Sequence, residues 1–269
     1  MQQLLQDWED KKVCEPRAII PHWRLQHAAS VVRFGLWFLR RMIDLSTSAS
    51  ETHHHLRLNR EFRSDLQWWA LFAPGWNGIN LLFPALQAMP QITVWSDTSG
   101  AWGFGACTTQ AWFHCWPDSW SQVNITAKEL LPIVLASTIW GPQWSGHTIK
   151  FRCDNQAIVS CLASWRSREP LVMHLLRGLA LLAMQFSFNF KAMHLPGKEN
   201  VAADALSRDN LSVFFAQMPH VPQAPTTMVQ ELEQLFLHQQ PDRLSTTWKQ
   251  VFSNFLQQVS LTPQLRPTQ

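Results

Sequence analysis

From residue 91 onward, short segments rich in β-branched and aromatic residues alternate with longer segments whose apolar residues recur at helical spacing. The short segments predict strands and the longer ones predict helices. The predicted strands are 91–97, the segment after the Gly-rich turn in "SGAWGFGACTT", 111–117, 147–154 and a half-buried strand over 186–195; the predicted helices are 124–140, 155–167, 170–184 and a short one capped by Asn200. This order predicts an α/β domain in which helices flank a mixed five-stranded sheet.

The segments on either side of this domain have a different pattern. Residues 1–90 are predicted to be mostly helical, because 25–45 and 58–72 place apolar residues at helical spacing, and "APGWNG" ends the second of these. Residues 210–269 contain six prolines around the amphipathic stretch "MVQELEQLFLHQQ". We therefore expect three parts: a helical segment 1–90, an α/β domain 91–209, and a Pro-containing linker with short, loosely attached helices over 210–269.

The composition limits the class of protein. With 269 residues, 46% of them hydrophobic, the chain can bury a substantial core, and its net charge of +3 is too small for a polybasic nucleic-acid binder. Five cysteines without a CxxC pair argue against a disulfide framework or a zinc knuckle. No signal peptide or membrane-spanning run is recognisable, so we expect a cytoplasmic or nuclear protein. The absence of tyrosine excludes tyrosine-based recombinase chemistry.

Four acids fall at the boundaries of the predicted elements. Asp97 ends the first strand, Glu129 lies near the start of the first helix, Asp154 ends the fourth strand, and Asp204 lies one turn inside the last helix. Each acid alone has a structural explanation, such as a helix cap or a favourable charge at a helix start. If all four converge on one edge of the sheet, their mutual repulsion requires a cation, and Mg²⁺ suits carboxylate oxygens. The set therefore predicts a metal site.

The motifs around these acids are "WSDTSGAWGFGA", "AKELLPIVLAS", "CDNQAIVS" and "HLPGKENVAADALSR". Together they resemble the Asp-Glu-Asp-Asp series of the ribonucleases H of retroelements, in which a His on a flexible loop precedes the last Asp, as His194 does here. The ending "NVAADALSR" is most similar to the ribonucleases H of DIRS-type and gypsy-type retrotransposons. The resemblance covers residues 91–209 and implies an RNase H-like fold.

In mechanistic terms, the resemblance implies cleavage of the RNA strand of an RNA–DNA hybrid with two Mg²⁺ (or Mn²⁺) ions. The four acids would hold the ions, and His194 would assist proton movement or product release. The hybrid contacts that the resemblance suggests come from Ser99, Gln156, Lys198 and Asn200, with Gln156 forming a D-x-Q arrangement after Asp154.

Residues 1–90 resemble the region between polymerase thumb and ribonuclease H in DIRS-type reverse transcriptases. This resemblance implies that the chain is the rear part of a polyprotein and that the polymerase portion is a partner. The chain itself has no tyrosine for a YxDD-type loop and no Asp-Asp pair, so it carries no polymerase site. One departure concerns Pro132, which falls in the helix that carries Glu129, where a proline removes an N–H and tends to kink the helix.

Three alternatives remain open at this stage. The first is a nucleic-acid or protein-binding module of the same fold, truncated or captured by a host genome, that is weak or inactive in catalysis. The second is a transposase or integrase of the same fold, against which the acid in the first helix and the Asp-Glu-Asp-Asp order argue. The third is a relic of an inactive element, which motifs alone do not exclude.

Overall fold

The computed structural model describes the α/β part of the chain in most detail. The described residues are 13–14, 29, 35–48, 51, 55–59, 62–63, 65–66, 69, 90–100, 103–115, 123–164 and 167–227. They fall into two compact units, the first comprising Met1–Pro90, Gln143–Thr148 and Arg177–Asn189, and the second Gln91–Pro142, Ile149–Leu176 and Phe190–Gln269. Each unit is described by itself. The three-part division predicted above stays a prediction.

The first unit contains both helix and strand. Among the described residues before 90, η1 (Gly35–Phe38) lies within the predicted helix 25–45, and α4 (Arg40–Thr47) overlaps its end and continues to Thr47. The strands β1 (Val13–Cys14) and β2 (Leu56–Arg57) form an antiparallel pair. The described part of residues 1–90 thus contains two short strands beside its helices, and each strand is too short to show a two-residue periodicity in the sequence.

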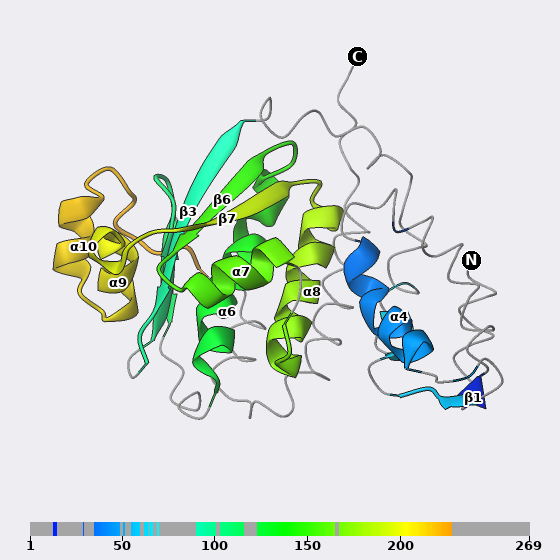
Figure 1. Cartoon of the computed structure of the whole chain (residues 1–269). Coiled ribbons are helices and arrows are strands. Elements are labelled where there is room, and N and C mark those ends of the chain that lie inside the picture. Colours follow the sequence, from blue (N-terminus) through cyan, green and yellow to red (C-terminus); the bar gives the residue numbers. More distant parts are fainter. Residues whose placement is uncertain are drawn as a thin grey trace, which may run out of the picture. The chain divides into compact units, whose positions relative to one another are not determined.

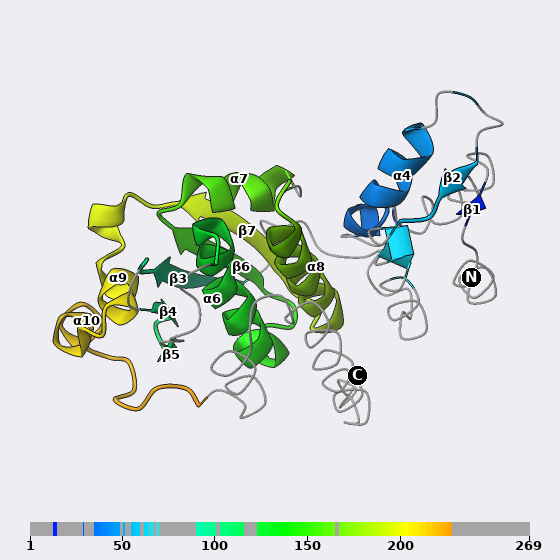
Figure 2. The same ribbon diagram turned by 90° about the horizontal axis from the view of Figure 1, so that it is seen from below.

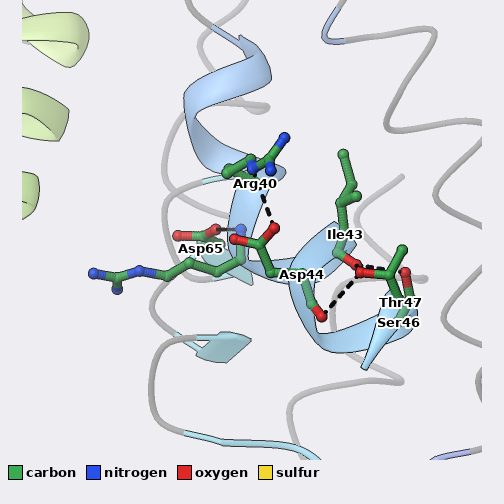
Figure 3. A network of polar contacts seen from close by, with 7 residues as sticks. Arg40, Ile43, Asp44, Ser46, Thr47 and Asp65 are labelled. Carbon is green, nitrogen blue, oxygen red and sulfur yellow. Dashed lines mark hydrogen bonds and ion pairs between the residues drawn. The ribbon is translucent and has the colours of Figure 1, made fainter. Parts of the chain in front are cut away.

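Figure 3 shows a network of polar contacts around α4 and Asp65 in this unit. Arg40 pairs with Asp44 one turn later at 3.1 Å, and the Arg41 backbone N–H donates to Asp65 Oδ2 at 3.3 Å. Asp65 is fully buried and forms an ion pair with Arg177 at 2.6 Å. Breaking such a pair leaves a buried charge uncompensated, which typically costs about 3–5 kcal/mol.

A five-stranded mixed sheet is the centre of the second unit, and its strands follow the order β5-β4-β3-β6-β7. The strands are β3 (Gln91–Thr98), β4 (Phe104–Cys107), β5 (Trp112–Cys115), β6 (Thr148–Cys153) and β7 (Asn189–His194). β3, β4 and β5 pair antiparallel. β6 and β7 run parallel, because the bonds from Asn189 N to His147 O and from Leu195 N to Cys153 O keep the same separation along the chain.

Helices cover both faces of this sheet (Figures 1 and 2), with α6 and α7 on one face and α9 and α10 on the other. The helices of this region are α6 (Ile125–Trp140), η4 (Gly141–Gln143), α7 (Gln156–Ser164), α8 (Pro170–Gln185), η5 (Gly197–Glu199), α9 (Val201–Ser207) and α10 (Leu211–Gln217). The fold class is therefore α/β, with a mixed five-stranded sheet flanked by helices and preceded by a segment that contains helix. The predicted element order from residue 91 is confirmed.

Two helix starts depend on asparagine, in different ways. The side chain of Asn124 accepts a hydrogen bond from Thr126 N at 2.8 Å, which confirms it as the N-cap of α6. Asn200 occupies the N-cap position of α9, but its side chain makes no capping bond. The predicted capping role of that side chain is wrong, because its amide donates to Ser96 O at 3.0 Å instead.

The last predicted strand begins later than expected. Residue 185 ends α8, a turn follows in which Ser187 has φ of 54°, and β7 begins at Asn189. Phe186, Phe188 and Phe190 are all buried, as expected, but only Phe190 lies in the strand. A helix end followed by a turn can bury alternate residues as a strand does. The two-residue alternation of apolar residues therefore does not distinguish a strand from a helix end at this point.

The described residues after 210 are packed against the sheet. Phe214 of α10 lies in a buried cluster with Cys107, Trp112 and Leu206. Trp112 also donates through Nε1 to Pro222 O, and its carbonyl accepts from Thr226 N, both at 2.7 Å. The first part of the segment predicted as a linker is thus structural, while its amphipathic stretch "MVQELEQLFLHQQ" lies outside the described residues.

Candidate metal centre

Three of the four predicted acids come together at one edge of the sheet. Asp97 is the last residue but one of β3, Asp154 directly follows β6, and Glu129 lies in the second turn of α6. One carboxylate oxygen from each lies within 4.8 Å of the other two. The matching ends of two neighbouring strands and the start of the helix on their face thus place three ligand atoms around one point.

The burial of these acids makes their ionisation unfavourable in the absence of a cation. Asp97 is 6% exposed and Glu129 is 7% exposed. Burial, with the charges of Asp97 and Asp154 adding to it, raises the pKa of Glu129 to about 8. Burial also raises the pKa of Asp97 to about 6, against a hydrogen bond from Ser207 that lowers it.

These properties fit a hard divalent cation. Glu129 Oε2 is buried and has no hydrogen-bond partner within the described part of the chain. A bound cation would satisfy that oxygen and remove the repulsion among the three acids. Oxygen-only ligands of this kind suit Mg²⁺ or Mn²⁺ better than a soft metal. Asp97, Glu129 and Asp154 could therefore hold a metal ion.

Pro132 does not displace Glu129 from this group. Helix α6 runs from Ile125 to Trp140 without interruption, and Glu129 lies within reach of Asp97 and Asp154. Pro132 therefore does not move Glu129 out of the group of three acids.

Asp204, the fourth predicted ligand, lies outside the group of three. Its side chain is 43% exposed, and its Oδ1 accepts from Arg208 Nε at 2.7 Å, one turn further along α9. It is nevertheless close enough for its charge to add to the upward shift of the Asp97 pKa, whose largest cause is burial. The ion pair explains why the acid points to Arg208 rather than to the other carboxylates.

Ser207 contacts the site, and the sequence interpretation missed it. Its hydroxyl is buried on α9 and donates to Asp97 Oδ2 at 2.6 Å. The close approach of α9 depends on Gly105, which pairs with Asp97 in the sheet and on which a Cβ would lie 2.5 Å from Leu206 Cβ. The serine in "ADALSR" was the available signal, but its partner is distant in sequence and nothing in the motif indicates it.

His194 is brought to the edge of the site. It ends β7, its side chain is exposed, and its Nε2 lies 3.1 Å from the backbone oxygen of Asp154. The turn after it also touches this acid, because a Cβ on Gly197 would lie 3.0 Å from Asp154 Oδ2. A glycine in "LPGKEN" thus leaves the carboxylate room that a side chain would restrict.

The four predicted hybrid contacts lie in different environments. Gln156 begins α7 and Lys198 lies in η5, and both are exposed. Ser99 follows β3 and is partly exposed, with its backbone N–H donating to Gly103 O at 2.8 Å. Asn200 is 1% exposed, and its bond to Ser96 ties the turn to β3. These contacts stay predictions, and burial gives Asn200 a structural role as well.

No protein-family model and no curated protein matches the sequence significantly. One solved structure, that of RNase H1 from the halophilic archaeon Halobacterium salinarum NRC-1, is similar to this chain at 17% sequence identity and a TM-score of 0.36. The match covers 45% of this chain and 98% of the archaeal one. Among the helices that the structure describes, none is long and apolar enough to cross a membrane.

Proposed function

We propose that this chain is a ribonuclease H, a metal-dependent endonuclease that cuts the RNA strand of an RNA–DNA hybrid. The observation that carries the proposal is the group of Asp97, Glu129 and Asp154 at the ends of β3 and β6 and in α6. Two of these acids are more than nine-tenths buried, an arrangement that is costly unless it binds a cation.

The proposed roles follow from the placement of each residue. Asp97, Glu129 and Asp154 hold the ions, and Asp204 joins them when its carboxylate leaves Arg208. Two bound Mg²⁺ or Mn²⁺ ions would supply an activated water and stabilise the leaving 3′ oxygen, giving products with a 5′ phosphate and a 3′ hydroxyl. His194, exposed at the rim beside Asp154, moves a proton or assists product release.

Recognition of the hybrid is proposed to depend on its shape and its 2′-hydroxyls, since A-form-like duplexes expose these in a shallow minor groove. Gln156 and Ser99 are the proposed hydrogen-bonding residues, and Asn200, whose amide donates to Ser96 O, supports the turn that follows His194. Lys198, exposed in η5, contributes salt-dependent affinity through a phosphate contact.

The proposed biological setting is a retrotransposon reverse transcriptase, with the polymerase portion as partner. The resemblance of "NVAADALSR" to DIRS-type and gypsy-type elements, and of residues 1–90 to DIRS-type reverse transcriptases, supports this setting. In such an assembly the polymerase would deliver the hybrid, so the chain alone is expected to bind it weakly.

The test is cleavage of a hybrid labelled on its RNA strand, with Mg²⁺ or Mn²⁺, by the wild type and by Asp154→Asn. A control variant, Asp209→Asn, changes an exposed acid that already has a positive φ of 57°, which asparagine tolerates. Metal-dependent cutting that Asp154→Asn abolishes and Asp209→Asn preserves supports the proposal. Hybrid binding without cutting by the wild type favours the binding module instead.

A further inference from the structure

Pro132 creates a gap in the hydrogen bonding of α6 next to the candidate metal centre. A proline has no backbone N–H, so the carbonyl four residues earlier does not receive its usual helical bond. That carbonyl belongs to Lys128, the residue directly before Glu129. Because Lys128 is buried, its carbonyl oxygen needs a donor from elsewhere in the protein.

Thr98 supplies this donor from the sheet. Its Oγ1 donates to Lys128 O at 3.0 Å, and both residues are 8% exposed. Thr98 directly follows Asp97 at the end of β3. A second bond, from Lys128 Nζ to Gly100 O at 3.4 Å, ties the same residue to the chain just beyond β3. Thr98, which is next to Asp97, thus holds Lys128, which is next to Glu129.

The bond from Thr98 to Lys128 connects the end of β3, which carries Asp97, with the part of α6 that carries Glu129. Successive side chains of a strand point to opposite faces, so Thr98 faces α6 while Asp97 faces α9, where Ser207 holds it. Along the helix, fixing the carbonyl of Lys128 fixes the rotation of α6 at the residue that follows. The position of Glu129 relative to Asp97 therefore depends on a contact that neither acid makes itself.

We propose that Pro132 and Thr98 are a pair of positioning residues: the proline opens the Lys128 carbonyl, the Thr98 hydroxyl bonds to it, and this bond sets Glu129 beside Asp97 for a divalent cation. The inference rests on the proposed function, since it assigns the bond a role in metal binding. The cost of losing groups that orient metal ligands is typically about 10–100-fold in affinity.

The experiment measures Mn²⁺ binding to the full chain by calorimetry, without nucleic acid, and the unfolding temperature of the metal-free protein in parallel. Thr98→Val keeps the shape and removes the hydroxyl, and it is expected to weaken Mn²⁺ binding about tenfold. Thr98→Ser keeps the hydroxyl and is expected to bind like the wild type. A matched control, Thr108→Val, removes the hydroxyl of another buried threonine that bonds only within its own turn, and should leave Mn²⁺ affinity unchanged.

Pro132→Ala gives the decisive comparison, because alanine restores the helical N–H to Lys128 O. Alone, it competes with Thr98 and should weaken Mn²⁺ binding. In this background, Thr98→Val should change the affinity less than about twofold, since the carbonyl now has its helical donor. A purely structural role would shift the unfolding temperature without this coupling in metal affinity.

The outcomes separate the inference from the proposed function. Two results would overturn the inference and leave the proposed function standing. In the first, the wild type and Thr98→Val bind Mn²⁺ equally well. In the second, Thr98→Val weakens Mn²⁺ binding by the same factor in the wild type and in the Pro132→Ala background. If the wild type does not bind Mn²⁺, both are overturned. If Thr98→Val does not fold, the other two variants provide the test. Thr98→Ser is expected to bind Mn²⁺ like the wild type, and equal Mn²⁺ affinity for the wild type and Pro132→Ala overturns the inference.

Discussion

Replacing Glu129 by Gln should raise the free energy of unfolding of the metal-free protein at neutral pH. The pKa of Glu129 is about 8 in the folded protein and 4.5 in its ordinary state, with burial as the main cause. An acid with a raised pKa binds its proton more tightly when folded. The contribution of Glu129 to the free energy of unfolding is therefore fully present below pH 4.5 and is lost as the pH rises toward 8.

The size of the effect follows from the same values. Each pH unit between the unfolded pKa and the working pH contributes about 1.4 kcal/mol. From 4.5 to pH 7 the wild type thus loses up to about 3 kcal/mol, and because Glu129 is buried, little of this is screened by water. Glutamine has nearly the same shape and no charge, so the variant avoids the loss.

The assay is urea unfolding at pH 5, 6, 7 and 8 in the presence of a chelator. The stability difference between variant and wild type should grow from under about 1 kcal/mol at pH 5 to about 3 kcal/mol at pH 7, and level off above pH 8. Excess Mg²⁺ should reverse the order, since only the wild type gains full binding energy. The control Glu169→Gln changes an exposed acid and should shift stability by no more than about 0.5 kcal/mol at any pH.

Equal pH dependence for the wild type and Glu129→Gln would refute the reasoning. So would a wild type that is the more stable protein at pH 7 without metal. Either result would mean that Glu129 is ionised at little cost and that the group does not need a cation to relieve it.

Three further substitutions test the surroundings of the acids. Ser207→Ala removes the hydrogen bond that lowers the pKa of Asp97, so this pKa should rise above about 6 and the acid limb of the pH profile of cleavage should move to higher pH. Gly197→Ala places a Cβ 3.0 Å from the Asp154 carboxylate and should lower Mg²⁺ affinity in calorimetry while leaving the unfolding temperature nearly unchanged, because the turn is exposed. Arg208→Ala frees the fourth acid of the series from an exposed pair worth about 0.3–0.5 kcal/mol, so the Mg²⁺ concentration for half-maximal cleavage should fall about twofold.

The sequence allowed the fold and the convergence of three acids to be predicted, because both depend on local patterns. The short strands and longer helices after residue 91 differ in apolar period, and Asp97, Glu129 and Asp154 fall at their ends. Ends of neighbouring strands meet at one edge of a sheet, so the convergence of these acids follows from the element order. The β1 and β2 pair and the late start of β7 were missed because two residues, or a helix end followed by a turn, carry no distinct period.

The contacts that orient the acids could not be predicted, because they join residues that are far apart in sequence. Ser207 reaches Asp97 across 110 positions, and Thr98 reaches Lys128 across 30. The ion pair that holds Asp204 away is local, by contrast, and the i,i+4 spacing with Arg208 was visible in "ADALSR".

The four acids are held in place by contacts of different strength, and this difference affects how the centre would bind a cation. Glu129 lies on the buried helix α6, and Asp97 and Asp154 lie at the ends of strands, so packing fixes all three before any cation binds. Asp204 is partly exposed and is held only by an exposed arginine one turn away. A weak surface pair costs little to break, whereas moving a buried acid would disturb the core. Asp97 and Glu129 are buried and Asp154 is half-buried, so these three acids form a preformed half of the centre. Under the proposed function, Asp204 is then the acid whose arrival depends on a bound cation or hybrid.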